Sequence, residues 1–126
     1  MKTLYESLFD IDDNIDKLDW DKIDLISVFN AKSKEEFMMM CDILDKRIQT
    51  EEKPSKCIAL INIYKHRSGS AIEVSRNGKK LWHNIYWDDK SNKVVRLRIP
   101  SYIHGDCWEM PKSLIPSFKE YEKIYG

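Results

Sequence analysis

Apolar residues recur at helical spacing in the first part of the chain. The stripe steps by four and three residues, which is typical of one helix face, through Leu4, Leu8, Ile11, Ile15 and Leu18. Seven aspartates lie between Asp10 and Asp24. They oppose one rigid helix, because Asp prefers caps and turns to helix interiors. We therefore expect residues 1–22 to form an acidic, partly helical N-terminal segment that precedes a single domain over residues 23–126.

A second helical stripe predicts the main helix of the protein. Ser33 and Glu36 form an S-x-x-E capping box, a pattern that marks a helix start. Behind it, apolar positions step by four, three and four residues through Phe37, Cys41, Leu44 and Ile48. The helix is predicted to run from Ser33 to Gln49, before the charged linker that contains Pro54, because the residue before a proline disfavours helical backbone.

Two stretches that flank this helix have strand character. Residues 23–29 are rich in β-branched and aromatic side chains, and Asp24 and Ser27 interrupt any clean helical face. This stretch is therefore predicted to be a strand. Residues 57–65, CIALINIYK, are apolar at nearly every position, which indicates a central strand that is covered on both faces.

From Ala71 onward, polar and apolar residues alternate, as expected for strands of a sheet. Asn77-Gly78 is the strongest short hairpin signal, because a type I′ turn needs positive φ at both central positions. A two-residue turn here pairs Val74 with Leu81. The predicted core face then carries Ile72, Val74, Leu81, His83, Ile85 and Trp87, and the opposite face carries Glu73, Ser75, Lys80, Trp82, Asn84 and Tyr86.

A second turn, through residues 88–93, leads to another strand that ends at Pro100. The tail contains a glycine loop and then a short helix, with Pro116 in its first turn and Phe118 and Tyr121 on its packing edge. The predicted fold class is therefore α+β. An antiparallel β-meander sheet of four to five strands is packed on one face by the main helix, and the short C-terminal helix closes its edge.

Composition limits the class of protein. With 126 residues, the chain suits one domain that buries its own core. No apolar run approaches the roughly 18 residues of a membrane span, and the N-terminus lacks a signal-peptide pattern, so we expect no membrane partner and a cytoplasmic location. The three cysteines are widely spaced without a C-x-x-C pair, which suggests neither a disulfide framework nor a zinc cluster.

Charge is unevenly distributed along the chain, although the net charge is zero. Residues 1–52 hold 14 acidic and 7 basic side chains, and residues 53–126 hold 7 acidic and 14 basic ones. If the two parts pack beside each other, their fields largely cancel; if they lie on opposite sides, a basic face remains to attract polyanions. The sequence leaves both arrangements open.

The loop that contains His104, Asp106 and Cys107 is the best candidate for catalysis. A cysteine nucleophile needs a base within reach and a third group that orients the base. The local patterns typical of catalytic cysteines are absent, however, and chance also places His and Cys in one loop. Metal-ligand spacings and a Gly-rich phosphate loop do not occur. We therefore expect no metal or cofactor and favour a non-enzymatic role.

The face opposite the predicted core combines basic and aromatic residues. It is expected to carry Lys80, Trp82, Tyr86, Arg96 and Arg98. Basic side chains neutralise phosphates while aromatic rings stack on bases, a combination that proteins use to bind single-stranded nucleic acid. Two other interpretations remain open. Lys and Arg commonly occupy the wet face of a sheet, where they discourage edge aggregation, and a helix could cover the aromatic residues.

Protein interaction is the favoured function. The chain contains four Trp and six Tyr, and Trp, Tyr and Arg dominate the energetics of protein interfaces. We expect non-catalytic binding of a macromolecular partner, either a protein or a second copy of the chain, through the basic and aromatic sheet face. Single-stranded nucleic-acid binding is the alternative, and a small cysteine- and histidine-dependent enzyme is the second alternative.

The start of the chain carries a resemblance that bears on origin. Residues 2–13, KTLYESLFDIDD, resemble a recurrent N-terminal segment, roughly K-x-L-x-E-S-L-x-D-x-[DE]-D. Many otherwise dissimilar small proteins of crAss-like phages and related elements of gut Bacteroidales carry this segment. The resemblance implies a phage or mobile-element origin, and with it a host or virion protein as partner. It implies no fold, activity or catalytic residue.

Overall fold

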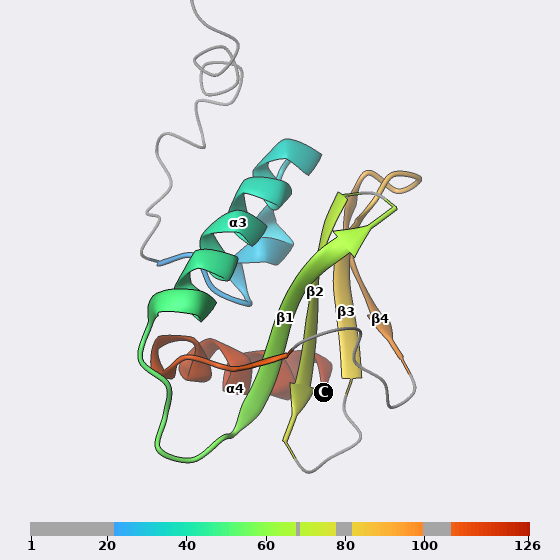
Figure 1. Ribbon diagram of the computed structural model, residues 1–126. Helices are drawn as coiled ribbons and strands as arrows, with labels where there is room; N and C mark the ends of the chain where they lie inside the picture. Colours follow the sequence, from blue (N-terminus) through green and yellow to red (C-terminus); the bar gives the residue numbers. More distant parts are fainter. Residues whose placement is uncertain (1–21, 68, 78–81, 100–106) are drawn as a thin grey trace, which may run out of the picture.

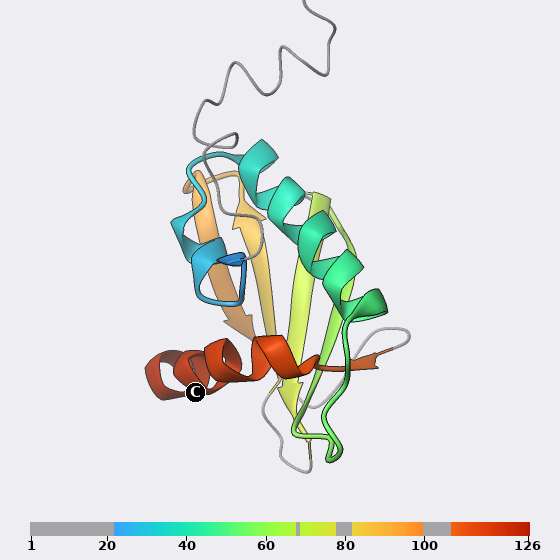
Figure 2. The ribbon, with the colours of Figure 1, turned by 90° about the vertical axis from the view of Figure 1, so that its left-hand side faces the viewer.

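The sheet and its helices are seen in a computed structural model that describes residues 22–67, 69–77, 82–99 and 107–126 (Figure 1). Nearly all of the predicted acidic segment lies outside the described residues. Five antiparallel strands form one open sheet, and helices cover one of its sides (Figure 2). The predicted α+β class is confirmed.

The strands are β1 (Ala59–His66), β2 (Gly69–Arg76), β3 (Trp82–Asp88), β4 (Lys93–Arg98) and β5 (Trp108–Glu109). They lie in the order β4-β3-β2-β1-β5, so β1 to β4 form the predicted meander. The two-residue strand β5, which is too short to show a sequence period, was not predicted. It pairs with β1 through Leu60 and Ile61, and β4 and β5 are therefore the two edges of the sheet.

The predicted pairing between β2 and β3 is wrong by two residues. Val74 pairs with His83, whereas a two-residue turn would have paired it with Leu81. The connection is longer than that turn, and residues 78–81 lie outside the described residues. A shift of two leaves each side chain on its predicted face, because the side-chain period of a strand is two. The described core-face residues are indeed buried: Ile72, Val74, His83, Ile85 and Trp87.

The main helix, α3 (Lys34–Thr50), confirms its prediction. The Oγ atom of Ser33 accepts a hydrogen bond from the N–H of Glu36 at 3.1 Å, which is the N-cap bond that the S-x-x-E pattern predicts. The apolar stripe of the helix packs against the sheet. Its four predicted members are fully buried: Phe37, Cys41, Leu44 and Ile48.

Residues 23–29 do not form the predicted strand. A short 3-10 helix, η2 (Ser27–Asn30), lies here. Oδ1 of Asp24 accepts hydrogen bonds from the N–H groups of Ile26 and Ser27, both at 2.9 Å. Such local side-chain bonds compete with the hydrogen bonds of a sheet. The β-branched composition therefore reflects burial, because the apolar side chains of this stretch join the core: Ile23, Leu25 and Val28.

The C-terminal helix, α4 (Ile115–Tyr125), lies on the same side of the sheet as α3 (Figure 2). Pro116 lies in its first turn, as predicted. Phe118 and Tyr121 are fully buried in the core that α3 and the sheet share. The helix therefore adds to the core on this face, whereas the prediction had placed it at the edge of the sheet.

Candidate functional site

Two of the five predicted binding residues cannot be placed with their side chains. Lys80 lies outside the described residues, as does the side chain of Trp82, whose backbone pairs with Ser75. The other three are described: Tyr86 in β3, and Arg96 and Arg98 in β4. Their positions test whether the predicted face exists.

Tyr86 and the two arginines lie on opposite faces of the sheet. Arg96 pairs with Ile85, and Arg98 pairs with His83. Directly opposed residues of an antiparallel pair share a face, so both arginines lie on the face that the helices cover. Tyr86, the neighbour of Ile85 in the strand, points to the other face. The predicted common face is therefore wrong for Arg96 and Arg98, because alternation within one strand does not fix its alignment with the next.

Arg96 remains exposed on the helix side because β4 is an edge strand. Its guanidinium lies 5.3 Å from the centre of the Tyr125 ring of α4, which is within the range of a cation–π contact. Its Nη1 atom lies 3.5 Å from Nε2 of His83. Arg96 thus covers the outer end of a buried aromatic cluster.

His83 belongs to the interior of that cluster. The side chain is 1% exposed, and its Nδ1 atom lies 2.7 Å from the hydroxyl of Tyr121. Burial, and next the positive charges of Arg96 and Arg98, lower the pKa of His83 to about 4. Because a guanidinium only donates hydrogen bonds, the Arg96 contact at Nε2 favours the tautomer that donates from Nδ1 to Tyr121. His83 is therefore a neutral, structural group of the core at pH 7, consistent with its predicted position.

Aromatic stacking holds η2 and α4 together next to His83. The ring of Phe29 stacks on Tyr125 with centroids 4.7 Å apart and on Tyr121 with centroids 6.1 Å apart. Burial raises the pKa of the Tyr121 hydroxyl, so it stays protonated. Tyr125 packs on Phe29 of η2 and on Tyr121 of its own helix, and this packing fixes its position beneath Arg96.

β4 is the longer of the two edge strands of the sheet. β4 has six residues and β5 has two, and within the described ranges only β3 pairs with β4. Every second residue of an edge strand directs its N–H and C=O groups away from the sheet. β4 carries three exposed cations, Lys93, Arg96 and Arg98, and Leu97, which is 50% exposed. The basic edge is defined as Lys93, Arg96, Leu97 and Arg98.

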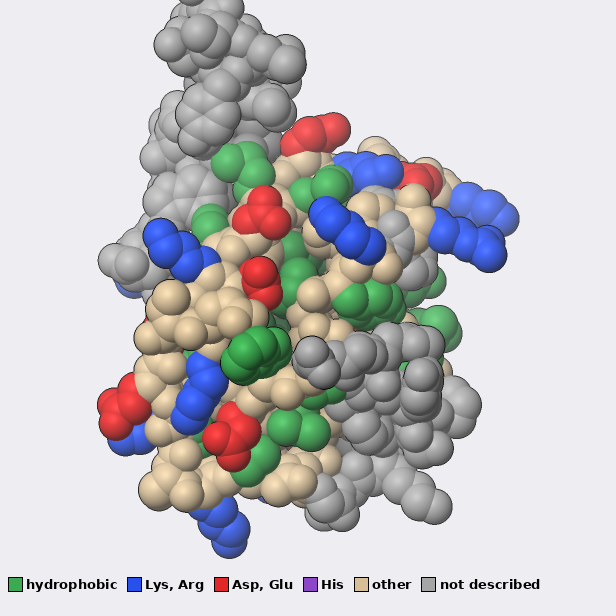
Figure 3. Space-filling view, viewed as in Figure 1, with side chains coloured by type: hydrophobic (Ala, Val, Ile, Leu, Met, Phe, Trp, Pro, Cys, Tyr) green, Lys and Arg blue, Asp and Glu red, His purple; other side chains and the backbone are tan. Residues whose placement is uncertain are grey.

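Two acidic side chains lie next to the basic edge, and one of them, Asp88, is directly opposite Lys93 in the ladder. Asp88 accepts a hydrogen bond from the N–H of Ser91 at 3.1 Å, and the Ser91 side chain lowers the pKa of this carboxyl. Asp89 pairs with Lys34 of α3 at 3.2 Å. Lys and Arg side chains, with acidic ones among them, lie around the end of the sheet at which the β3–β4 turn lies (Figure 3). A negatively charged segment would meet a favourable field at this edge.

The face of the sheet opposite the helices is polar but closed in its middle. Glu73 is fully buried, and its Oε1 atom accepts a hydrogen bond from Asn62 at 3.4 Å. Burial, and next the charge of Glu73, raise the pKa of Tyr64. The Oγ atom of Ser75 and Oδ1 of Asn84 are buried and have no hydrogen-bond partner among the described residues, although such atoms usually have one. This face is therefore no open platform on which bases could stack.

The candidate catalytic loop is described only at its end. His104 and Asp106 lie outside the described residues, and Cys107 immediately precedes β5. The other two thiols are not activated. Burial raises the pKa of Cys41, and burial together with the neighbouring carboxylate of Glu109 raises that of Cys57. A catalytic role of the loop stays a prediction.

Comparisons with known proteins give no functional assignment. No protein-family model matches the chain, and no curated protein or solved structure shows significant similarity to it. Among the described side chains, no three His, Cys, Asp or Glu are grouped to hold a metal ion. No helix in the described ranges is long and apolar enough to cross a membrane. The functional proposal accordingly rests on the basic edge. Two of its members, Lys93 and Leu97, were not among the predicted binding residues.

Proposed function

We propose that the protein binds a protein partner by strand addition, in which an extended acidic segment of the partner pairs with β4. The observation that carries this proposal is the basic edge. It belongs to β4, a six-residue edge strand with three exposed cations, and within the described residues no strand other than β3 pairs with β4. In strand addition, backbone hydrogen bonds supply affinity, and alternate side chains supply specificity.

The two sides of β4 define the chemistry of the partner. Arg96 and Arg98 lie on the helix side, and Leu97 lies on the opposite side. An added strand therefore meets Arg96 and Arg98 on one face, and Leu97 together with Lys93 on the other. Opposite charges at opposed positions in a sheet stabilise it by about 0.2–1 kcal/mol per pair. A strand with acidic residues at alternate positions and apolar residues between them fits this edge.

Self-association through β4 fits less well. Symmetric antiparallel pairing centred on Arg96 places Arg96 of each copy directly opposite Arg96 of the other. Like charges that face each other directly destabilise a sheet, and cations on an edge protect against such pairing. The basic edge thus favours a partner of different sequence over a second copy.

The sequence of residues 2–13 bears on where the partner comes from. The resemblance of residues 2–13 to the recurrent phage segment supports a partner from the host cell or the virion. It also supports a cytoplasmic or virion-associated site of action for the protein.

Synthetic peptides and amide hydrogen exchange test the proposal. One probe is a short peptide that alternates Asp and Val, and its matched control alternates Lys and Val. We expect the acidic peptide alone to bind and to slow exchange at every second amide of β4, because only outward N–H groups gain a partner. A peptide of residues 1–21, which hold seven acidic and two basic side chains, is then tested as a competitor of the Asp-Val peptide for β4.

Charge reversal on β4 supplies the matched variants. The double variant Arg96→Glu/Arg98→Glu, which changes two cations on the same face of β4, should weaken binding of the acidic peptide about tenfold, because two favourable opposed pairs become unfavourable. Lys119→Glu, at an exposed position of α4, should leave its affinity unchanged. Unaltered affinity in the double variant, or protection that avoids β4, would refute strand addition. Binding of a single-stranded oligonucleotide in place of the peptide, with steep salt dependence, would support the nucleic-acid alternative.

A further inference from the structure

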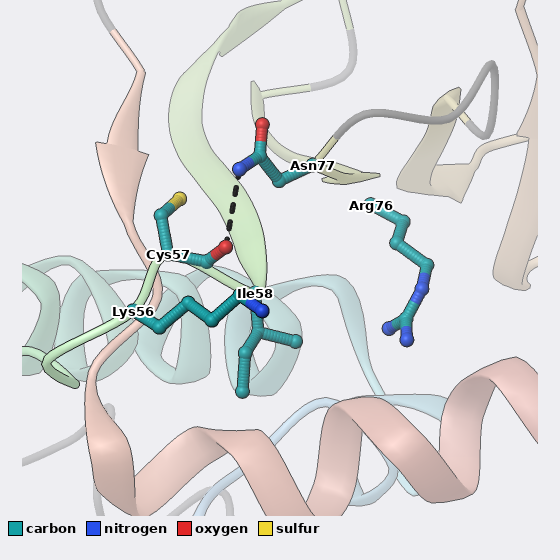
Figure 4. A pocket seen from close by; sticks show the side chains of 5 residues that line it. All are labelled: Lys56, Cys57, Ile58, Arg76 and Asn77. Atoms are coloured by element: carbon teal, nitrogen blue, oxygen red, sulfur yellow. Dashed lines mark hydrogen bonds between the residues drawn. The ribbon is translucent and has the colours of Figure 1, made fainter.

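A pocket of about 330 Å³ lies where β1 begins and β2 ends (Figure 4). Its size is at the lower end of the range of about 300–1,000 Å³ for small-molecule sites. Of its five described lining residues, two are cationic, one is an amide, one is a thiol and one is aliphatic. The lining consists of Lys56, Cys57, Ile58, Arg76 and Asn77.

Backbone and side-chain hydrogen bonds fix the wall of the pocket. Arg76 pairs with Ala59 in the β1–β2 ladder. The N–H of Asn77 donates to the carbonyl of Ile58 at 3.0 Å. Its side-chain amide donates to the carbonyl of Cys57 at 3.1 Å, the bond drawn in Figure 4. Because these bonds hold the residues in place without a ligand, little ordering is needed when a ligand binds.

The charges around the pocket leave donors available to an anion. Nη1 of Arg76 pairs with Oε1 of Glu122 on α4 at 2.9 Å. A guanidinium has five N–H donors, so this ion pair uses only part of its capacity. Lys56 is exposed and, among the described residues, pairs with no carboxylate. Its side chain extends across Ile58 on the side where Arg76 lies (Figure 4). A second carboxylate, that of Glu109, lies next to Cys57, so the charges near the pocket are balanced, and the pocket offers an anion the unused N–H donors of Arg76 and Lys56.

We propose that this pocket binds a small molecule that carries a phosphate or carboxylate group. Arg76 is the principal contact, because its planar fork matches both groups, and Lys56 adds a second positive charge. Ile58 packs against an apolar part of the ligand. Glu122 competes with the ligand for Arg76 and so limits the affinity. The site involves no residue of the basic edge, so the two proposals stand or fall separately.

Titration by two-dimensional NMR of the full chain tests the site. The probes are inorganic phosphate and acetate, added separately at constant ionic strength, and methylammonium is the cationic control. We expect saturable shifts of the backbone amides of residues 56–58 and 76–77 and of the Asn77 side-chain amide. The anion that saturates these signals at the lower concentration identifies the group preferred. Methylammonium should leave them unchanged.

Three variants distinguish a binding pocket from a purely structural ion pair. Glu122→Gln should tighten anion binding about threefold to fivefold, because the competing carboxylate is removed, and Lys56→Ala should weaken it by a similar factor, as expected for an exposed charge pair. Glu120→Gln, an exposed position on the same helix, is the matched control and should change nothing. Absence of saturable shifts with both anions would overturn the proposal. Equal affinity of Glu122→Gln and the parent protein would also overturn it, because Glu122 would then not compete for the site.

Discussion

The buried imidazole of His83 should make the stability of the protein depend on pH in a characteristic way. The unfolded chain takes up a proton on this side chain near its ordinary pKa of 6.5, whereas the folded protein holds the pKa at about 4. Between these values the unfolded state binds more protons than the folded state. The free energy of unfolding must therefore fall as the pH is lowered. At neutral pH the imidazole is uncharged in both states and contributes no such dependence.

The size of the effect follows from the pKa difference. Each pKa unit corresponds to 1.36 kcal/mol, so the full loss, reached below about pH 4, is about 3 kcal/mol. Between pH 7.5 and pH 5, where most carboxylates are still ionised, the expected loss is about 2 kcal/mol. This is a large part of the roughly 5–15 kcal/mol by which domains are stable.

Urea unfolding of the parent protein and of His83→Asn measures this contribution. Asparagine keeps a short polar group near the hydroxyl of Tyr121 but does not titrate. All other ionisable groups are shared, so the difference in pH dependence between the two proteins belongs to His83. We expect the parent to lose about 2 kcal/mol more than the variant from pH 7.5 to pH 5. Parallel losses in the two proteins, or an imidazole NMR signal that titrates near pH 6.5, would refute the assignment of a neutral core histidine.

Two further predictions concern backbone features. Ser33→Ala removes the N-cap bond to the Glu36 N–H and should lower the free energy of unfolding by about 1 kcal/mol; Ser55→Ala, at an exposed loop position, is the control, and equal losses would contradict a capping role. Gly69→Ala places a Cβ atom 2.9 Å from Sδ of Met38 at a residue with φ of +115° and should cost about 1–3 kcal/mol. Adding Met38→Ala removes the steric contact but not the backbone strain. Full recovery of the free energy of unfolding in a urea titration would therefore show that the contact alone caused the loss.

Elements whose residues interact within a few positions were predictable from the sequence. The S-x-x-E pattern and the apolar stripe of α3 are local, and each favours the same helix start and the same buried face. The alternation of β2 and β3 likewise identified their core faces. Burial enforces this assignment, because a strand with one apolar face cannot slip by one residue without exposing that face.

Predictions failed where a local polar group or a distant partner determined the structure. In residues 23–29 the side chain of Asp24 bonds two following N–H groups and replaces strand geometry, although the composition favours a strand. At Asn77-Gly78 the dipeptide predicted the presence of a hairpin but not its length. β5 exists only through its pairing with Leu60 and Ile61. The length of the β2–β3 connection and the partner of β5 cannot be identified from local spacing, and in the prediction the local bonds of Asp24 were outweighed by the β-branched composition around it.

The position of the basic edge depends on the turn between β3 and β4, whose length sets how the two strands are aligned. Asp88 pairs with Lys93, and Asn92 closes the turn with φ of +56° and an N–H bond to the Asp88 carbonyl at 2.8 Å. One more residue in this turn would place Arg96 opposite Tyr86 and recreate the predicted basic and aromatic face. The strand sequence is compatible with both alignments, because β4 is exposed and little apolar burial distinguishes them. The length of the turn therefore determines that Arg96 and Arg98 lie on the helix side of the sheet. There they flank the outer backbone of an edge strand and do not join Tyr86 in a stacking surface.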